Sequence, residues 1–456
     1  MREVMEMDLS ASGMQTGDFP KAAYQQKSAL RVAIVHDWLP VYGGAERVLE
    51  QILRIFPQAD VFSTIDLIKD GERGFLRNKP VVTSFLQKNE WVRRHYRLFL
   101  PIMPLAVEQF DLASYELVIS SSCSIAKGVI TGPGQLHVCY CHSPMRYAWD
   151  MQNRYLTESK LTRGPASWLA RSFLHFLRMW DAQTHQRVDH FLTNSEFVRG
   201  RIRKFYGRDA SVVYPPVGVD KFPLCSEKED YYVTASRMVP YKMVGLIVEA
   251  FAHLPGRELR VIGDGPEFEA IKRRATPNVK MMGYQPAQVL TAQLQRAKAF
   301  VFAAEEDFGI APLEAQACGT PVIAFGKGGA LETVVSEKTG LFFGEQTVQS
   351  LCNAIELFEE SAESFEPAEI REHALKFSDR KFRENFYQAV ALKWSASGRD
   401  AGVLERSASS DAEGFQNDEA ANEIDVRGGK KKSTRLVFSR PGGWAKAAAA
   451  VRAALF

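Results

Sequence analysis

Two acidic side chains eight positions apart, Glu306 and Glu314, frame the segment with the clearest chemical pattern. The segment reads EDFGIAPLE and follows an apolar run at 299–302, which predicts Glu306 on the loop after a strand and Glu314 near the start of the next helix. Between them, Gly309 lets backbone N–H groups approach an anion closely. Donors for phosphate would therefore flank acceptors for hydroxyls. An acidic loop before a helix, where negative charge is favoured anyway, would explain any single residue but explains the ensemble poorly.

A second cluster places two cations, Arg237 and Lys242, around a turn after the predicted strand 231–235. An arginine can donate two parallel hydrogen bonds to phosphate oxygens, and a lysine adds a movable point charge. Charge-assisted hydrogen bonds of this kind are worth about 1.5–3 kcal/mol each. The cluster therefore suits a diphosphate, although without the acidic segment a solvated surface pair would be the preferred interpretation.

The first half of the chain contributes two weaker patterns. Gly43 and Gly44 precede a helical pattern whose N-terminal amides would face an anion in a cleft. His142 ends the predicted strand 137–141, and Pro144 should stop that strand and expose the imidazole ring. Because single histidines are usually structural, the pattern leaves a structural and a functional role for His142 equally open.

These residues must be positioned by short β-prone runs that alternate with amphipathic helical patterns. In the first helical pattern apolar residues recur at three- and four-residue steps from Val48 to Phe56, and Pro57 ends it. The alternation predicts two tandem, Rossmann-like α/β domains, each with a doubly wound parallel sheet, and a ligand cleft near the C-terminal ends of the strands. The other predicted strands are 32–35, 59–64, 81–85, 117–121, 191–194, 212–214, 258–262, 279–282 and 321–325.

Pro215 and Pro216 mark the boundary between the two domains, because their missing N–H groups make the segment unsuited to a helix or a central strand. The predicted units are a flexible leader at 1–29, an N-terminal Rossmann-like domain at 30–214, a C-terminal Rossmann-like domain at 215–396 and a low-complexity, disordered tail at 397–456. The last helix of the second domain could return to the first.

Composition excludes several classes of protein. The 57 basic and 54 acidic residues leave a net charge of +3, too small an excess for a nucleic-acid binder. Six scattered cysteines without a CxxC pair argue against a disulfide scaffold or a zinc site and fit a reducing compartment. The leader lacks the basic start and apolar core of a secretion signal, and the longest apolar run falls short of the roughly 20 residues that span a bilayer. We therefore expect a cytoplasmic protein.

With these motifs assembled, the sequence from about Arg31 to Trp394 resembles the retaining GT-B glycosyltransferases of family 4. The resemblance implies that the first domain faces the acceptor and the second binds a nucleotide sugar. It also implies that the catalytic residues are His142, Arg237, Lys242 and Glu306, and that the residues binding the nucleotide sugar are Gly43, Gly44, Arg237, Lys242, Phe308, Gly309, Ile310 and Glu314. No two aspartates flank a single residue, the pattern many sugar-nucleotide enzymes use to hold a divalent metal, so we expect neither a metal nor another cofactor.

Several stretches resemble bacterial mannosyltransferases that build O-antigen or exopolysaccharide repeat units: 36–38, 43–46, 142–150 and 214–217. The resemblance favours GDP-mannose as donor and a saccharide, linked to polyprenyl diphosphate, as acceptor. A UDP- or ADP-sugar donor, or a non-catalytic scaffold that binds sugar nucleotides, remains an alternative. Basic and aromatic residues near Trp91 and Trp168 could contact the inner face of the cytoplasmic membrane, although helices packed on their own domain explain them equally well.

Overall fold

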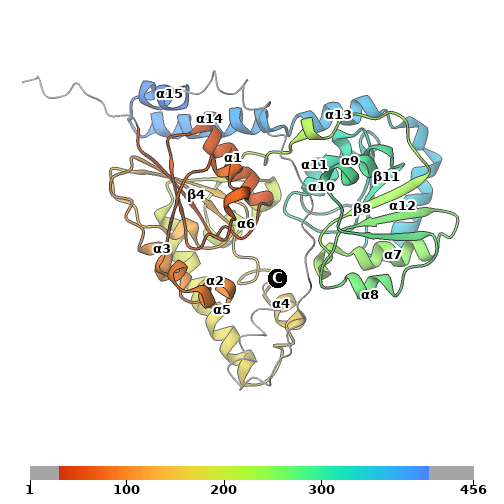
Figure 1. The fold of residues 1–456 in the computed structure, drawn as a ribbon, viewed down its shortest axis with the longest axis horizontal. Coiled ribbons are helices and arrows are strands. Elements are labelled where there is room, and N and C mark those ends of the chain that lie inside the picture. Colours follow the sequence, from red (N-terminus) through yellow and green to blue (C-terminus); the bar gives the residue numbers. More distant parts are fainter. Residues whose placement is uncertain (1–29, 410–456) are drawn as a thin grey trace, which may run out of the picture.

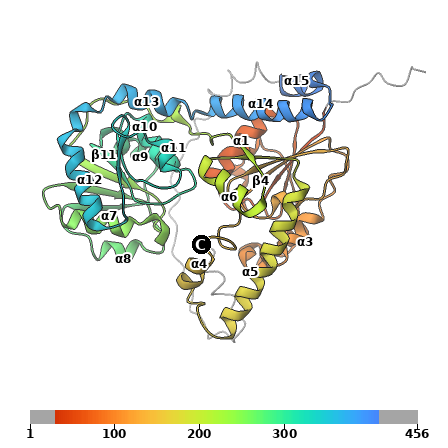
Figure 2. The ribbon, with the colours of Figure 1, turned by 180° about the vertical axis from the view of Figure 1, so that it is seen from behind.

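The computed structural model describes residues 30–409, which form two parallel β-sheets covered by helices (Figures 1 and 2). The seven strands of the first sheet lie in the order β3-β2-β1-β4-β5-β6-β7, and the six of the second in the order β10-β9-β8-β11-β12-β13. Every strand pair is parallel. The predicted architecture of two tandem α/β domains is confirmed.

In the first sheet the strand order reverses at β1 (Val32–His36), which pairs with β2 on one side and β4 on the other. Crossover helices cover both faces, as parallel pairing requires. The remaining strands are β2 (Asp60–Ser63), β3 (Val81–Thr83), β4 (Leu117–Ser122), β5 (Leu136–Cys141), β6 (His190–Thr193) and β7 (Ala210–Val212). The helices are α1 (Gly44–Ile55), α2 (Glu90–Arg94), α3 (Met103–Glu108), α4 (Gln152–Glu158), α5 (Pro165–Thr184) and α6 (Glu196–Tyr206).

The second sheet reverses in the same way at β8 (Tyr231–Ala235), between β9 and β11. Its other strands are β9 (Glu258–Ile262), β10 (Val279–Gly283), β11 (Ala299–Phe302), β12 (Val322–Phe325) and β13 (Gly340–Phe343). Its helices are α7 (Val244–Ala252), α8 (Phe268–Lys272), α9 (Ala287–Arg296), α10 (Ile310–Ala317), α11 (Ala330–Thr333), α12 (Val348–Glu360) and α13 (Pro367–Leu375). The loops after β1, β5, β8 and β11, which carry the predicted site residues, therefore leave the C-terminal edges of the two sheets.

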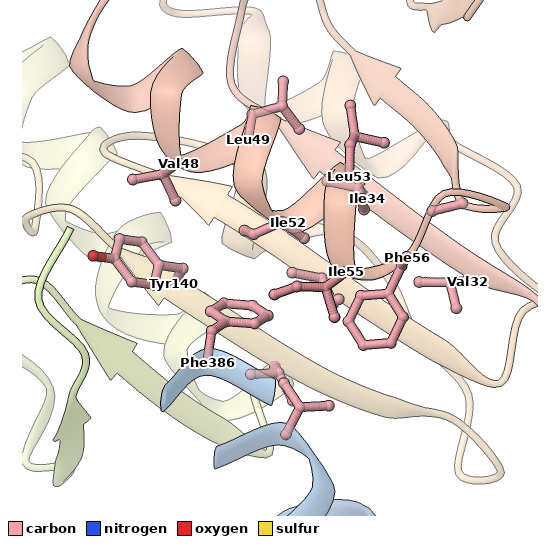
Figure 3. Close-up of a cluster of buried hydrophobic side chains, with 14 of the residues drawn as sticks. Val32, Ile34, Val48, Leu49, Ile52, Leu53, Ile55, Phe56, Tyr140 and Phe386 are labelled. Carbon is pink, nitrogen blue, oxygen red and sulfur yellow. The ribbon is translucent and has the colours of Figure 1, made fainter. Parts of the chain in front are cut away.

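The core of the first domain shows why α1 forms where the spacing predicts it. Val48, Leu49, Ile52 and Leu53 of this helix are fully buried against the sheet (Figure 3). On the other side of the same core lies Phe386, which belongs to a helix more than three hundred residues later in the chain. The apolar face of α1 is therefore enclosed by both neighbouring and distant parts of the sequence.

That distant helix, α14 (Asp379–Ala396), follows α13 and crosses from the second domain to the first (Figure 1). Phe382, Phe386, Val390 and Trp394 are buried in the core of the first domain. The chain thus connects the two domains twice, once before β8 and once between α13 and α14.

The structure corrects the predicted start of the irregular tail. Residues 401–409 form a helix, α15 (Ala401–Ser409), in which Leu404 is buried in the core of the first domain. The backbone carbonyl of Asp400 accepts a hydrogen bond from Trp394 Nε1 at 3.0 Å, which fixes the turn between α14 and α15. The prediction failed there because the serine- and alanine-rich composition hid a single buried contact. The leader at 1–29 and the remainder of the tail, 410–456, lie outside the described residues.

Candidate active site

A cavity of about 640 Å³ lies between the two domains at the C-terminal edges of both sheets. All of the predicted site residues border it. From the first domain these are Gly43, Gly44 and His142, and from the second Arg237, Lys242, Glu306, Phe308, Gly309, Ile310 and Glu314. Residues up to 271 positions apart in the sequence, from Gly43 to Glu314, are therefore brought to one place.

Lys242 and Glu306 form an ion pair inside this cavity. Lys242 ends the short turn Pro240–Lys242, and Met243 after it adopts a left-handed backbone with φ of 55°. Burial disfavours the charged ammonium, but the Glu306 carboxylate outweighs that effect, so the pKa of Lys242 lies above its usual value. The lysine is thus held as a cation at the place where a diphosphate could replace or join the carboxylate.

Two helix N-termini face each other across the cavity. Gly43 and Gly309 are the N-cap residues of α1 and α10, and Gly309 has φ of 91°, a conformation that favours glycine. Gly44 lies close to the Ile310 side chain: a Cβ added at Gly44 would stand 3.4 Å from its Cδ1. Free N–H groups at both ends would favour an anion between the helices.

Arg47 of α1 was not among the predicted residues. It donates a hydrogen bond at 2.7 Å to Glu314, across the cleft. Burial disfavours the guanidinium charge, whereas Glu314 favours it and raises the pKa of Arg47 above its usual value. No sequence pattern predicts this contact, because 267 positions separate the partners and Arg47 lies in an ordinary helical pattern.

Asp307 joins the domains through a second set of charges that the prediction missed. It forms ion pairs with Arg201 of α6 and, at 3.4 Å, with Arg146. Arg201 also pairs with Asp150 at 3.0 Å. The carboxylate that follows Glu306 in the sequence therefore faces the first domain.

A smaller, mostly apolar cavity of about 280 Å³ opens beside His142 and shares Arg146, Asn194 and Asp307 with the main cavity. Ser143 Oγ and Arg146 Nε at its wall are buried without a hydrogen-bond partner. A buried polar atom without a hydrogen-bond partner destabilises the protein unless a ligand or water supplies that partner. The remaining lining includes Trp38, Tyr96, Arg97, Leu100, Met103, Tyr147 and Tyr155.

A third cavity, of about 560 Å³, adjoins the main one at Tyr42, Arg47 and Glu314. It extends between α1 and α9 and is bordered by Gln51 and Asp379. Together the two spaces could hold a ligand larger than a diphosphate sugar alone.

Neither a metal cluster nor a membrane span emerges from the described part of the chain. Among residues 30–409, no three His, Cys, Asp or Glu side chains are grouped so that they could hold a metal ion. Within the same range, none of the helices has the length and apolarity needed to cross a membrane.

Two family models match the chain. The model described as Glycosyltransferase Family 4 matches residues 42–221, and the model described as Glycosyl transferases group 1 matches residues 220–376. The two matches meet near the predicted domain boundary.

Individual relatives match over shorter stretches. The chain is 30% identical over 192 residues to the GDP-mannose-dependent alpha-(1-6)-phosphatidylinositol monomannoside mannosyltransferase of Mycolicibacterium smegmatis, covering 35% of this chain and 50% of that protein. It is 28% identical over 226 residues to D-inositol 3-phosphate glycosyltransferase of Mycobacteroides abscessus, covering 43% and 50%. The chain spans about half the length of these curated relatives.

Solved structures share the fold at lower sequence identity. Sucrose-phosphate synthase from Thermosynechococcus elongatus superimposes with a TM-score of 0.63 at 17% identity, covering 80% of this chain and 100% of that chain. A lipopolysaccharide outer core galactosyltransferase in its apo form gives 0.56 at 18%, with the same coverage. Taken with the two family matches and the paired parallel sheets, these similarities show that the chain belongs to the family 4 glycosyltransferases of the GT-B fold.

Proposed function

We propose that this protein is a retaining glycosyltransferase that moves mannose from GDP-mannose to a saccharide acceptor in bacterial surface polysaccharide synthesis. The observation that carries the proposal is the convergence, in one cavity, of Arg237, Lys242 and the N-termini of α1 and α10 beside Glu306 and Glu314. Cations and free amides would hold the diphosphate, and the two carboxylates would accept hydrogen bonds from sugar and ribose hydroxyls.

The residues would act mainly by electrostatics. When the bond from the anomeric carbon to the diphosphate breaks, negative charge grows on the leaving oxygens, and preorganised cations and amides stabilise that charge more than the ground state. Lys242, which pairs with Glu306, would then also contact the phosphate. In this proposal the acceptor attacks from the face that the diphosphate leaves, and the reaction needs neither a covalent nucleophile nor a metal.

The donor is proposed from the relatives: the Mycolicibacterium smegmatis protein is named as GDP-mannose-dependent. An Anabaena protein with the same fold, at 16% identity and a TM-score of 0.57, was solved with UDP-glucose. The test is a thermal-shift panel of GDP, UDP, ADP and their sugar conjugates, in which a ligand at about a hundred times its Kd stabilises by roughly 2.7 kcal/mol.

We expect the largest shift with GDP-mannose, together with slow release of GDP when no acceptor is present. If a UDP- or ADP-sugar gives a larger shift and is hydrolysed, that sugar nucleotide replaces GDP-mannose as the proposed donor. Binding without hydrolysis of any conjugate, with or without chelator, would support the non-catalytic scaffold instead. The anomeric configuration of the released mannose, followed by NMR, tests retention: the first product should be the α anomer, as in the donor.

The acceptor would lie in the apolar cavity beside His142, where aromatic rings can stack on a sugar and the unpartnered Ser143 Oγ can bind a hydroxyl. We propose a lipid-linked saccharide because α2, α3 and α5 expose large apolar side chains and α3 also contributes Met103 to this cavity. Helices α3 and α5 lie together in both views (Figures 1 and 2). The exposed apolar side chains are Trp91, Leu105, Trp168, Leu169, Phe176 and Met179, together with Ile102 at the N-cap of α3.

Such a face would rest on the cytoplasmic leaflet, aided by Arg93, Arg94 and Arg171. Sedimentation with vesicles containing acidic lipid checks this proposal at low salt. We expect binding by the parent, reduced binding by the double variant Trp168→Ser and Leu169→Ser, and unchanged binding by Leu392→Ser, which alters an equally exposed leucine on α14. Absence of binding by the parent would remove the membrane from the proposal.

A further inference from the structure

A row of four side chains, three of them buried, connects the N-terminus of α1 to His142 at the wall of the cavity. Glu46 Oε1 lies 3.6 Å from His36 Nε2. His36 Nδ1 lies 3.1 Å from Ser121 Oγ, and Ser121 Oγ lies 2.8 Å from His142 Nε2. Glu46, His36 and Ser121 are each less than a tenth exposed, whereas His142 borders both the main cavity and the apolar cavity.

The Glu46 carboxylate at one end of this row decides which atom donates and which accepts at each contact along it. At 3.6 Å the Glu46 carboxylate lies beyond hydrogen-bond distance of His36 Nε2, but its negative charge favours a proton on that nitrogen. In neutral His36, Nδ1 then accepts from the Ser121 hydroxyl, whose oxygen must in turn accept from His142 Nε2–H. Burial, followed by the proximity of His36, lowers the pKa of His142 to about 3, so the imidazole carries a single proton.

Placing that proton on Nε2 leaves the other ring nitrogen as an acceptor. Among the hydrogen bonds of the described residues, those of His142 use its backbone groups and Nε2, while Nδ1 is left for the cavity. We infer that Glu46, His36 and Ser121 are positioning residues that hold His142 in the Nε2–H tautomer, so that Nδ1 accepts a hydrogen bond from a donor-sugar hydroxyl. The inference deepens the proposed function and rests on it for the identity of the ligand.

The neighbouring position on the same strand provides a matched control. Ser120 Oγ also lies 2.8 Å from a histidine nitrogen, Nε2 of His137, which is fully buried and donates its Nδ1–H to the Arg187 carbonyl. This second serine–histidine pair faces away from the cavity. Loss of Ser120 therefore reproduces the packing defect expected at Ser121 without touching the site.

The direct test is ¹⁵N NMR of the full chain labelled at the histidine imidazoles, because protonated and unprotonated ring nitrogens resonate at well-separated frequencies. A His142→Gln variant identifies the signals of His142. We expect Nε2 protonated and Nδ1 bare in the parent and in Ser120→Ala, and a mixture of the two tautomers in Ser121→Ala and Glu46→Gln. A proton on Nδ1 in the parent, or a tautomer unaffected by Ser121→Ala and Glu46→Gln, would overturn the inference.

Kinetics supply the second readout. With the preferred sugar nucleotide, Ser121→Ala should lower kcat by about tenfold, the loss of roughly one hydrogen bond, while affinity for the nucleoside diphosphate alone changes less than about twofold. In a His142→Ala background, Ser121→Ala should lower kcat no further. A packing defect would instead lower kcat again in that background. Additive losses, or an equal loss in Ser120→Ala, would refute a positioning role.

The two experiments separate this inference from the function it rests on. If no sugar nucleotide is hydrolysed or bound, the proposed function fails, but the NMR experiment still reports whether the chain sets the tautomer of His142. If donors are turned over and the tautomer is mixed in the parent, the function stands and the positioning role fails.

Discussion

In the cleft, groups that could hold phosphate or sugar are paired with one another. Lys242 contacts Glu306, and Arg47 contacts Glu314 across the domains. These pairs keep buried charges compensated, since an isolated buried charge would be costly. A bound sugar nucleotide would add its own anion and hydroxyls to these pairs, so the ion pairs hold the side chains near their working positions.

Replacing Lys242 by alanine should remove a preorganised donor to the leaving diphosphate. Such a loss typically costs about 2.7–4 kcal/mol in the transition state, so turnover should fall roughly a hundredfold to a thousandfold. Steady-state assays of Lys242→Ala check this, with Lys272→Ala, an exposed lysine on α8, as control. Activity within a few-fold of the parent would refute the role given to Lys242.

Two buried histidines make the folded protein sensitive to acid. Burial lowers the pKa of His137 to about 4 and that of His142 to about 3. Below about pH 6.5 these histidines bind protons in the unfolded chain but not in the folded protein. The free energy of unfolding therefore falls by up to about 1.4 kcal/mol per histidine for each further pH unit, until the folded pKa is reached. Denaturant unfolding at about pH 7.5 and about pH 5.5 should show this loss, and His137→Gln should reduce it. Equal stability at both pH values would contradict the assignment.

Among residues, the sequence predicted those that lie within one motif. Glu306, Gly309 and Glu314 share a segment, and all three reach the cavity. Arg47 and Asp307 were missed as interdomain contacts because their partners become neighbours only after both sheets have formed. Spacing along one chain carries no information about such pairs.

At the scale of elements, a buried polar network fixes the loop after β4 that borders the apolar cavity. Asp37 accepts hydrogen bonds from the backbone N–H groups of Cys123, Ile125 and Ala126 at 2.6–2.7 Å. The turn that follows is anchored by Lys127, which pairs with Asp181 of α5. The sequence signal was the pair His36 and Asp37 at the end of β1, which belongs to the stretch 36–38 that resembles bacterial mannosyltransferases.

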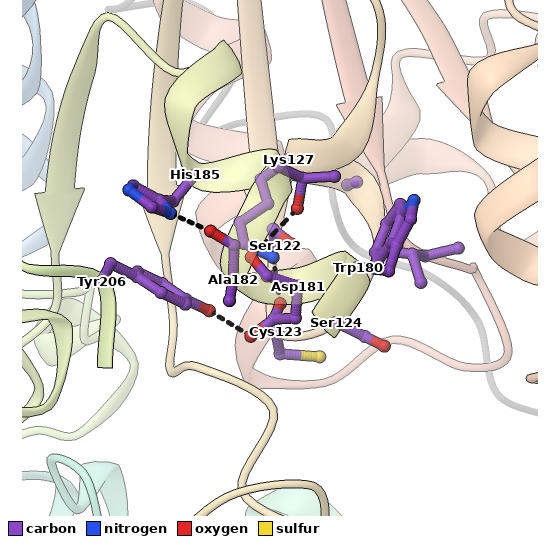
Figure 4. A network of polar contacts seen from close by, with 12 residues as sticks. Ser122, Cys123, Ser124, Lys127, Trp180, Asp181, Ala182, His185 and Tyr206 are labelled. Atoms are coloured by element: carbon purple, nitrogen blue, oxygen red, sulfur yellow. Dashed lines mark hydrogen bonds and ion pairs between the residues drawn. The ribbon is translucent and has the colours of Figure 1, made fainter. Parts of the chain in front are cut away.

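Asp181 is the centre of this network (Figure 4). It pairs with Lys127 and accepts hydrogen bonds from Trp149 Nε1 at 2.7 Å and Tyr206 Oη at 2.8 Å. Both charged side chains are almost completely excluded from solvent. One carboxylate thus joins α5, α6 and the loop after β4.

Asp181→Asn should leave Lys127 as an uncompensated buried charge and destabilise the protein by about 3–5 kcal/mol. Asp230→Asn, which breaks an exposed pair with Lys298, should cost less than about 1 kcal/mol. Chemical denaturation of both variants measures the difference. Similar free energies of unfolding would mean that the buried pair contributes no more than a surface pair.

Periodicity located most elements but misjudged their ends. The three- and four-residue spacing placed α1 correctly because its apolar face is buried against a sheet. The run at 81–85 was too long, since Ser84 caps a short helical turn by accepting a hydrogen bond from Leu86 N. The sequence did not predict α15, because the burial of this helix depends on the core of the first domain, which is formed by residues far from it in the chain.

For the whole molecule, charged contacts on the cleft hold the domains together. Glu332 of α11 accepts hydrogen bonds from Glu196 N and Phe197 N at 2.8 and 3.0 Å, at the N-terminus of α6. Asp307 adds its pairs with Arg146 and Arg201. All of these contacts break if the domains separate.

Arg201→Ala should therefore favour a more open arrangement of the domains. We expect a larger radius of gyration by small-angle scattering and a raised KM for the sugar nucleotide, since binding must then close the cleft. Arg203→Ala, on the same helix but paired with Asp209 within its own domain, is the control. A radius and KM equal to those of the parent would show that Arg201 does not hold the domains.

The passage of α14 back to the first domain has a consequence for anyone who recombines this chain with a relative. A hybrid that takes everything after residue 215 from another protein would also import a foreign α14, and with it mismatched partners for Phe56 and Tyr140. Junctions set on both sides of the second sheet, before β8 and after α13, would instead transplant the second domain as one intact insert.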